Sequence, residues 1–306
     1  MIRVDRAGRL RAGVALAGAL ALTVLACEDV TAPPGPPTIP TFVYVSDSGG
    51  YSGLVRFRND SSVRLTSGSK NTEPRSAAGR LVFTSERDGY AQVYISDLDV
   101  TTPHRVMASN SFDRTAALSP RADSIVFVSL RTGVPRLWLI RAPALNQATY
   151  DSAQPLSTGS QLYTPEDGPA WSPVGGKIAF TSVRGGNSQV YIVASGGGAA
   201  QVVTNESGGA FQPEWSADGN SIYYIAATPD YSLRVVSASG GTARTVVADS
   251  LLVAGPTSCN SSVCLFSTGF GTAAGTMSAL AVQNDSVLVL FPRTAAMEQQ
   301  PAILHP

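Results

Sequence analysis

Short apolar segments separated by tight turns dominate the hydrophobic pattern, most clearly across residues 169–195. Proline and glycine mark both breaks, since Pro fixes φ and Gly supplies positive φ. We expect strands at residues 170–172, 177–182 and 189–194. Residues 178–180 and 190–193 are apolar at every position instead of alternating with polar ones. A sheet built from such strands must be covered on both faces.

The second of these strands recurs six times along the chain, at residues 42–46, 81–85, 125–129, 178–182, 222–226 and 263–267. Most copies are about 40 to 50 residues apart, the period of a propeller blade. Each unit reads as a first strand ending near Ser-Pro, this apolar second strand, a third strand and a short fourth one. The pattern predicts an all-β fold, a six-bladed β-propeller of four-stranded antiparallel blades over residues 42–306.

The two ends of this region are expected to share one blade. No first strand precedes Phe42, whereas residues 300–306 have the length and the final proline of a first strand with nothing after it. We therefore predict that blade one is closed by the C-terminal strand, which would leave the ring without a long open edge.

The first 26 residues read as a lipoprotein signal peptide. Four arginines precede an apolar run, residues 13–26, which is too short to span a membrane. The run ends in Leu-Ala before Cys27, which resembles a lipobox, so Cys27 is the expected lipidated residue. Residues 27–41 form a Pro-rich tether. The expected location is the bacterial envelope, lipid-anchored at the periplasmic face or outer membrane; an ordinary signal peptide with a chance cysteine is the alternative.

The other two cysteines, Cys259 and Cys264, form an even pair in an oxidising compartment. A disulfide between them is the expected state.

Several copies of one motif resemble a known family. The matching residues before the second strand include Pro169, Trp171, Pro213 and Trp215, and an Arg–Gly turn follows the strand. The repeat resembles TolB-like, WD-repeat-like six-bladed propellers, and also the N-terminal propeller of prolyl-oligopeptidase-type peptidases. The resemblance implies the fold more than the function, because these residues mostly build blades. We expect only a tether before the propeller, unlike in TolB, and no hydrolase domain after it, unlike in the peptidases.

Charge and composition argue against several functions. The chain has 22 Lys plus Arg and 22 Asp plus Glu, so a nucleic-acid partner is not expected. The two histidines, His104 and His305, are distant in sequence, and there is no G-x-S-x-G elbow. No His/Cys spacing suggests a metal. We therefore expect no catalytic residue, no metal and no cofactor.

Six charged residues are the candidates for a binding site at the mouth of the central channel. An arginine follows three of the apolar strands, and a carboxylate lies in three of the loops that lead to a first strand; the residues are Arg87, Arg131, Arg184, Glu73, Asp113 and Asp167. One interpretation pairs each arginine with an acceptor in its own blade. The other is a polar ring that docks a peptide or a glycan.

These observations favour a monomeric, membrane-anchored scaffold that binds an envelope protein, peptide or glycan without catalysis. The alternative function is a carbohydrate- or peptide-processing enzyme with its site at the channel. A third interpretation is an inert spacer.

Overall fold

The computed structural model describes residues 38–48, 50–143, 152–160, 164–227, 231–247, 253–268, 276–281, 287–289 and 298–305. The chain divides into two compact units, residues 1–36 and 37–306. The predicted signal peptide, Cys27 and most of the tether lie outside the described residues. Among those described, no helix is long and apolar enough to cross a membrane.

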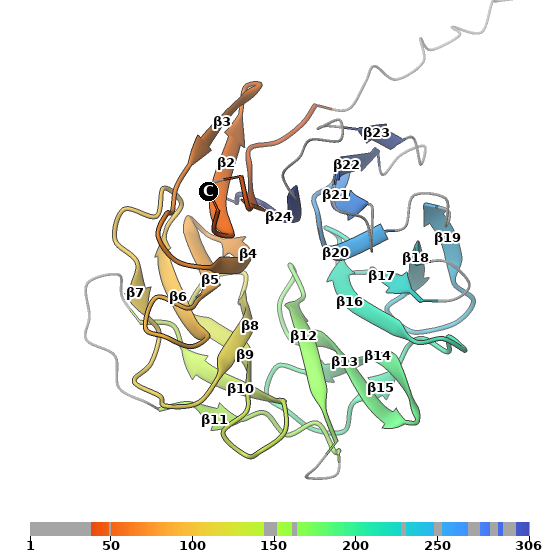
Figure 1. Cartoon of the computed structure of the whole chain (residues 1–306). Helices are drawn as coiled ribbons and strands as arrows, with labels where there is room; N and C mark the ends of the chain where they lie inside the picture. The colour runs from red at the N-terminus through yellow and green to blue at the C-terminus, as the bar shows by residue number, and fades with distance from the viewer. Residues whose placement is uncertain are drawn as a thin grey trace, which may run out of the picture. The chain divides into compact units, whose positions relative to one another are not determined.

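The strands of residues 37–306 pair into six four-stranded antiparallel sheets (Figure 1). Three of these sheets come from the first half of the chain and the C-terminus. They are β24 (Glu298–Ile303), β1 (Phe42–Ser46), β2 (Gly53–Arg58) and β3 (Ser61–Arg64); β4 (Asn71–Ala77), β5 (Arg80–Ser85), β6 (Gln92–Asp97) and β7 (His104–Arg105); and β8 (Asp113–Leu118), β9 (Ser124–Ser129), β10 (Arg136–Arg141) and β11 (Gln154–Pro155).

The other three sheets are consecutive in sequence. They are β12 (Glu166–Trp171), β13 (Lys177–Gly185), β14 (Asn187–Ala194) and β15 (Gln201–Val202); β16 (Ala210–Trp215), β17 (Ser221–Ala226), β18 (Ser232–Ser237) and β19 (Arg244–Val247); and β20 (Val253–Cys259), β21 (Val263–Thr268), β22 (Thr276–Ala281) and β23 (Val287–Val289). The predicted all-β propeller of four-stranded antiparallel blades is confirmed.

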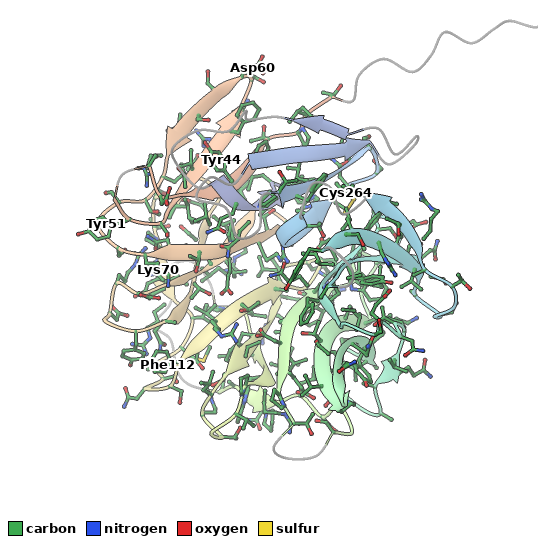
Figure 2. All side chains as sticks on the ribbon, turned by 45° about the vertical axis from the view of Figure 1, so that its right-hand side comes forward. Tyr44, Tyr51, Asp60, Lys70, Phe112 and Cys264 are labelled. Carbon is green, nitrogen blue, oxygen red and sulfur yellow. A yellow bond between two sulfur atoms is a disulfide. The ribbon has the colours of Figure 1, made fainter. Side chains whose placement is uncertain are left out.

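The apolar strands are covered on both faces because each sheet packs between two neighbours. In β9, Ile125 and Phe127 pack into one hydrophobic cluster with β5 and β6. The alternate residues Val126 and Val128 pack into another cluster with β13 and β14. All four side chains are fully buried. Figure 2 shows side chains filling the spaces between the sheets, whereas Tyr51 and Phe112 project at the edge and are 58% and 53% exposed.

The pairing register is interrupted in the strand nearest the centre of the propeller in all six sheets, here called the innermost strand (β24, β4, β8, β12, β16 and β20; Figure 1). In five of these strands the third residue lies in the bulge. Those residues adopt positive φ: Glu73 (55°), Thr115 (49°), Gly168 (57°), Gln212 (50°) and Gln300 (54°). The pairing register shifts at each of these positions. In four of the five strands the next residue is proline, whose missing N–H costs nothing within a bulge.

The bulge explains a wrong prediction of strand bounds. We expected a strand at residues 170–172, but β12 already begins at Glu166. The expectation placed Glu73, Asp113 and Asp167 in connecting loops, whereas all three lie inside innermost strands. The sequence Asp-Gly-Pro resembles a turn, yet in the structure Gly168 and Pro169 are the bulge that lets the strand continue.

The C-terminal strand pairs with the N-terminal one. β24 lies antiparallel to β1, with Phe42 opposite Ile303 and Val43 opposite Ala302. Ala302 and Ile303 are 1% and 3% exposed. The predicted pairing of the two ends of this region is therefore present, although the strand begins at Glu298 and ends at Ile303.

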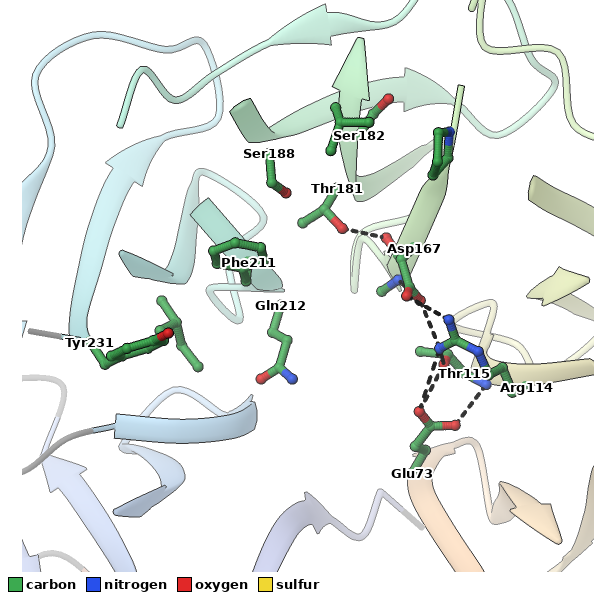
Figure 3. A pocket seen from close by; sticks show the side chains of 14 residues that line it. Glu73, Arg114, Thr115, Asp167, Thr181, Ser182, Ser188, Phe211, Gln212 and Tyr231 are labelled. Atoms are coloured by element: carbon green, nitrogen blue, oxygen red, sulfur yellow. Dashed lines mark hydrogen bonds and ion pairs between the residues drawn. The ribbon is translucent and has the colours of Figure 1, made fainter. Parts of the chain in front are cut away.

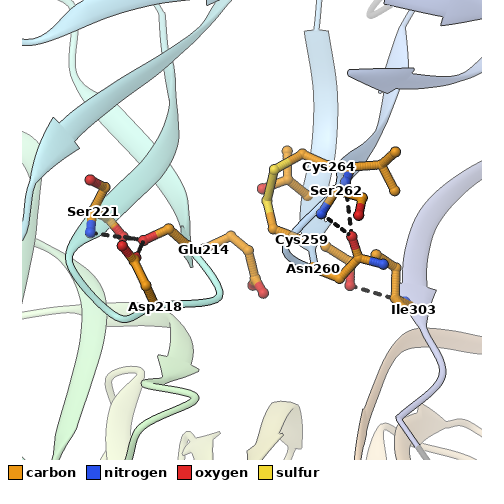
Figure 4. The surroundings of a disulfide bond; sticks show 12 residues. Glu214, Asp218, Ser221, Cys259, Asn260, Ser262, Cys264 and Ile303 are labelled. Carbon is orange, nitrogen blue, oxygen red and sulfur yellow. Dashed lines mark hydrogen bonds between the residues drawn. A yellow bond between two sulfur atoms is a disulfide. The ribbon is translucent and has the colours of Figure 1, made fainter. Parts of the chain in front are cut away.

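Cys259 and Cys264 form a disulfide across the turn between β20 and β21, where the two residues lie opposite each other (Figure 4). The turn inside it is fixed by Asn260, whose Oδ1 accepts hydrogen bonds from the backbone N–H of Ser262 and Val263, both at 2.8 Å. The disulfide and these two hydrogen bonds therefore hold the same turn.

Candidate functional site

A pocket of about 520 Å³ lies where four innermost strands begin. Residues of β4, β8, β12 and β16 line it, together with residues of β13, β14 and β17 and the residues that precede β12 and β18. The described lining residues are Glu73, Arg114, Thr115, Pro165, Asp167, Gly168, Thr181, Ser182, Val183, Ser188, Phe211, Gln212, Ile225 and Tyr231. This volume is within the range of about 300–1,000 Å³ common for ligand sites.

One wall of the pocket is charged, with Arg114 held between two carboxylates (Figure 3). Arg114 donates to both oxygens of Asp167, at 3.1 and 2.7 Å, and its Nη1 lies 3.9 Å from Glu73 Oε1. Partial burial lowers the pKa of Arg114, but the ion pairs with Asp167 and Glu73 offset this and raise that pKa overall. The guanidinium is therefore a fixed charge that orients both acids.

Glu73 also links three sheets. Its carboxylate accepts from Thr84 Oγ1 at 2.7 Å in its own sheet, and from the backbone N–H and Oγ1 of Thr115 at 2.9 and 2.8 Å in the next. Its backbone N–H donates to Gln300 Oε1 of β24 at 2.8 Å. These bonds hold two left-handed residues, Glu73 and Thr115, in a conformation that non-glycine residues rarely adopt.

The opposite wall is apolar and aromatic. Phe211, which is 37% exposed, and Tyr231 lie on this side (Figure 3), and the lining also includes the apolar residues Val183 and Ile225. Gln212 reaches into the pocket from the same side, and its buried Oε1 has no hydrogen-bond partner among the described residues (Figure 3). The pocket thus combines an aromatic wall with a charged one.

Two of the six candidate residues, Glu73 and Asp167, line this pocket, whereas Arg131 and Asp113 form a separate pair, with 3.5 Å between Arg131 Nη2 and Asp113 Oδ1. Asp113 is fully buried, and Arg87 lines a separate pocket between the first two sheets. Arg131 and Arg184 lie outside the described lining of both pockets.

The three arginines instead share one arrangement within their own sheets. Each guanidinium lies over the ring of an aromatic residue on the third strand, at 4.4 Å for Arg87 and Arg131 and 4.5 Å for Arg184. Each Nε donates to a serine two residues earlier. Each also faces a buried polar residue that begins the innermost strand, namely Asn71, Asp113 or Glu166. These contacts match the within-blade interpretation.

The sequence interpretation did not single out Arg114, Thr115, Phe211 and Gln212. All four lie at the second or third position of an innermost strand. For Phe211 and Gln212 a signal was present, because they directly precede a proline of the repeated motif. The bulge turns this stretch toward the pocket, and neither periodicity nor propensity encodes that rotation.

A second ion pair joins the innermost strands of two sheets that are not neighbours in the ring. Arg75 of β4 lies with its Nη2 3.8 Å from Glu214 Oε2 of β16, and it donates to the backbone oxygen of Thr257 in β20 at 3.1 Å. Both charged side chains are 18% exposed. Burial raises the pKa of Glu214 to about 7, although Arg75 and a backbone hydrogen bond at Cys259 oppose this shift.

No cluster of three or more His, Cys, Asp or Glu that could hold a metal occurs in the described part of the chain. The described lining of the pocket contains two carboxylates but no imidazole.

Comparisons with known proteins agree with this architecture. Residues 152–289 match a family model described as the TolB beta propeller domain. A TolB homolog of Chlorobium chlorochromatii is 29% identical over 152 residues, which are 48% of this chain and 31% of that protein. The chain thus spans about a third of the length of that relative.

Solved structures show the same fold. TolB from Acinetobacter baumannii superposes with a TM-score of 0.69 at 18% identity, over 87% of this chain and 67% of that one. A puromycin-hydrolysing peptidase of Mycobacterium tuberculosis superposes with a TM-score of 0.54 at 16% identity, over 84% of this chain and 49% of that one. The resemblance to TolB-like propellers, and to those of peptidases, is confirmed for the fold.

Proposed function

We propose that this TolB-like propeller is a binding scaffold of the bacterial envelope, with its six sheets acting as the blades of one closed ring. The observation that carries the proposal is the pocket, in which residues from four sheets converge on one cavity. Such a site at the start of several strands suits the capture of a partner segment. The name TolB among its relatives supports an envelope role.

The arrangement of the two pocket acids supports binding over catalysis. General acid–base chemistry usually needs a group poised to exchange a proton near neutral pH. Here both oxygens of Asp167 accept hydrogen bonds from Arg114, and the carboxyl group of Glu73 already accepts three hydrogen bonds. In our proposal both acids therefore serve to bind and position, because their oxygens are already engaged by neighbouring donors.

The direct test is capture of a partner from the envelope. Tagged full-length protein would be crosslinked in cells and its partners identified by mass spectrometry. We expect one envelope protein to be recovered with the wild type and lost with Phe211→Ala, whose side chain is exposed in the pocket. Arg121→Ala is the control, because this side chain is 88% exposed in a turn outside the described pocket lining. Equal recovery from all three proteins, or turnover of peptides or oligosaccharides by the wild type, would contradict the scaffold.

We further propose that Cys27 anchors the chain as a lipoprotein. One acyl chain binds a membrane only marginally, whereas two or more bind it stably. Cys27→Ser should therefore move the protein from the membrane pellet to the soluble fraction of the envelope. Fractionation and immunoblotting would show it, and an unchanged distribution would rule out the anchor.

A further inference from the structure

Several hydroxyl groups that line the pocket donate their hydrogen bonds to the protein and not into the cavity. The hydroxyl groups of Thr115, Thr181 and Ser188 donate back into the wall, to Glu73 Oε1, Asp167 O and Ala210 O. The pocket therefore presents few free donors among these side chains.

Acceptors, in contrast, remain in excess. Two carboxylates, Glu73 and Asp167, face one guanidinium, Arg114, so the described charged residues of the lining sum to one negative charge. The side chain of Asp167 is 43% exposed, and its Oδ2 accepts one hydrogen bond from Arg114. A carboxylate oxygen can accept two.

The apolar wall restricts what kind of donor fits. Phe211 and Tyr231 offer aromatic surface on the side of the pocket away from the acids (Figure 3). A small hydrated cation would leave this wall unused. A lysine or arginine side chain would use both walls, because its methylene stem covers apolar surface while its charged head keeps polar contacts. Its cation would also be attracted to the aromatic faces.

From this complementarity we propose that the pocket receives a lysine or arginine side chain of the partner's bound segment. The head group donates to the exposed Asp167 Oδ2, and the stem packs on Phe211 and Tyr231. The inference rests on the proposed scaffold function and specifies the chemistry that the partner must present.

The test uses a probe that does not require the natural partner. A random heptapeptide library displayed on phage would be panned against the full-length protein. We expect the selected peptides to share one Lys or Arg flanked by apolar residues. For the best peptide, replacing that residue with norleucine should weaken binding at least tenfold, since this removes the charge and keeps the stem.

Three variants locate the binding. Asp167→Asn should weaken the selected peptide about tenfold, and Gln212→Lys should abolish binding, because it places a tethered ammonium group in the same space. Asp60→Asn is the control: it makes the same charge change in the β2–β3 turn, at a residue with φ 57° where Asn is well tolerated. Melting curves would show that each variant folds, and Gln212→Lys keeps both acids if Asp167→Asn does not fold.

Selection of acidic or purely apolar peptides, failure to select any peptide, or equal losses with Asp60→Asn would overturn the inference. The scaffold function is judged separately by crosslinking. If crosslinking recovers a partner but panning selects no peptides with Lys or Arg, only the proposed chemistry of the pocket is refuted. If panning selects peptides with Lys or Arg but crosslinking recovers no envelope protein, only the proposed scaffold function is refuted.

Discussion

Arg184 shows at the scale of single residues why the repeated arginines stabilise the fold. Its Nη2 lies 2.9 Å from Glu166 Oε1, and the side chain of Glu166 is fully buried. Burial lowers the pKa of the guanidinium, yet it is held between the carboxylate and the ring of Tyr191. Removing one partner of a buried ion pair leaves the other charge uncompensated.

We predict that Arg184→Ala lowers the free energy of unfolding by about 2 kcal/mol. This is less than the roughly 3–5 kcal/mol typical of a broken buried pair, because Arg136 Nε still lies 3.1 Å from Glu166 Oε2. Arg121→Ala, which removes a pair whose arginine is 88% exposed, should change stability by less than about 1 kcal/mol. Urea denaturation of both variants measures the difference, and equal midpoints would refute the structural role.

The recurring Arg–Gly turn could be predicted from the sequence, and so could its location after an apolar strand. The partner residues could not be predicted fully. The sequence interpretation offered Glu73, Asp113 and Asp167 as acceptors, but the arginines face Asn71, Asp113 and Glu166, which occupy the first position of each innermost strand. The partners could not be predicted because the sequence does not show at which residue each innermost strand begins.

At the scale of elements, the bulge decides where the innermost strand begins and which side chains reach the pocket. Proline normally ends a strand prediction, because it cannot donate to the ladder. Here Gly168 and Pro169 are the extra residues of the bulge, so the ladder resumes on both sides of them. The outer strands were predictable because their apolar runs are uninterrupted, whereas the bulge depends on pairing that a single strand does not encode.

We predict that Gly168→Ala destabilises the protein by about 1 kcal/mol through backbone strain. Its φ is 57°, in the left-handed region, where a Cβ costs roughly 1–2 kcal/mol. Space is not the reason, because the nearest atoms to an added Cβ lie at 3.8 Å.

Gly196→Ala provides the matched control for this strain. Gly196 is not among the glycines with positive φ, and an added Cβ there meets nothing within 4 Å. Thermal melts should show a loss for Gly168→Ala only. Equal stability of both variants would mean that the bulge tolerates a side chain at no cost, as it does where Glu73 and Thr115 are held by hydrogen bonds.

At the scale of the whole molecule, the C-terminal strand joins three sheets. Besides pairing with β1, it receives hydrogen bonds from the second sheet, where Ser76 Oγ donates to the backbone oxygen of Ile303 at 2.6 Å. It also donates to the last sheet, through the Ile303 N–H to Ser258 Oγ at 3.0 Å. The pairing of β24 with β1 could be predicted from the sequence, because the first repeat lacks an innermost strand and residues 300–306 resemble one.

We predict that a chain ending at Gln299 melts at a lower temperature and forms oligomers. The truncation exposes the edge of β1, whose five residues are all buried, and an apolar unpaired edge invites association. Losing the buried Ile303 alone costs roughly 1.5–3 kcal/mol. A chain ending at His305 keeps β24 and serves as the control in size-exclusion chromatography. A stable monomer after the longer truncation would refute closure by this strand.

Burial of the Glu214 carboxyl group makes the stability of the protein depend on pH, although the nearby Arg75 opposes the effect. The pKa of Glu214 is raised to about 7 from an ordinary value of 4.5, so between these values the folded state binds more protons than the unfolded state. Stability should therefore fall as pH rises from about 4.5 to 7 and change little from this source above 7. The loss is at most about 3 kcal/mol, and less in practice because the side chain keeps 18% exposure.

Glu214→Gln should remove most of this dependence of stability on pH, because the amide cannot ionise. Glu86→Gln, at a side chain 42% exposed and paired with Lys70, should retain it. Denaturant midpoints measured from pH 4.5 to 8 compare the three proteins, and a slope unchanged in Glu214→Gln would assign the pH dependence to another group.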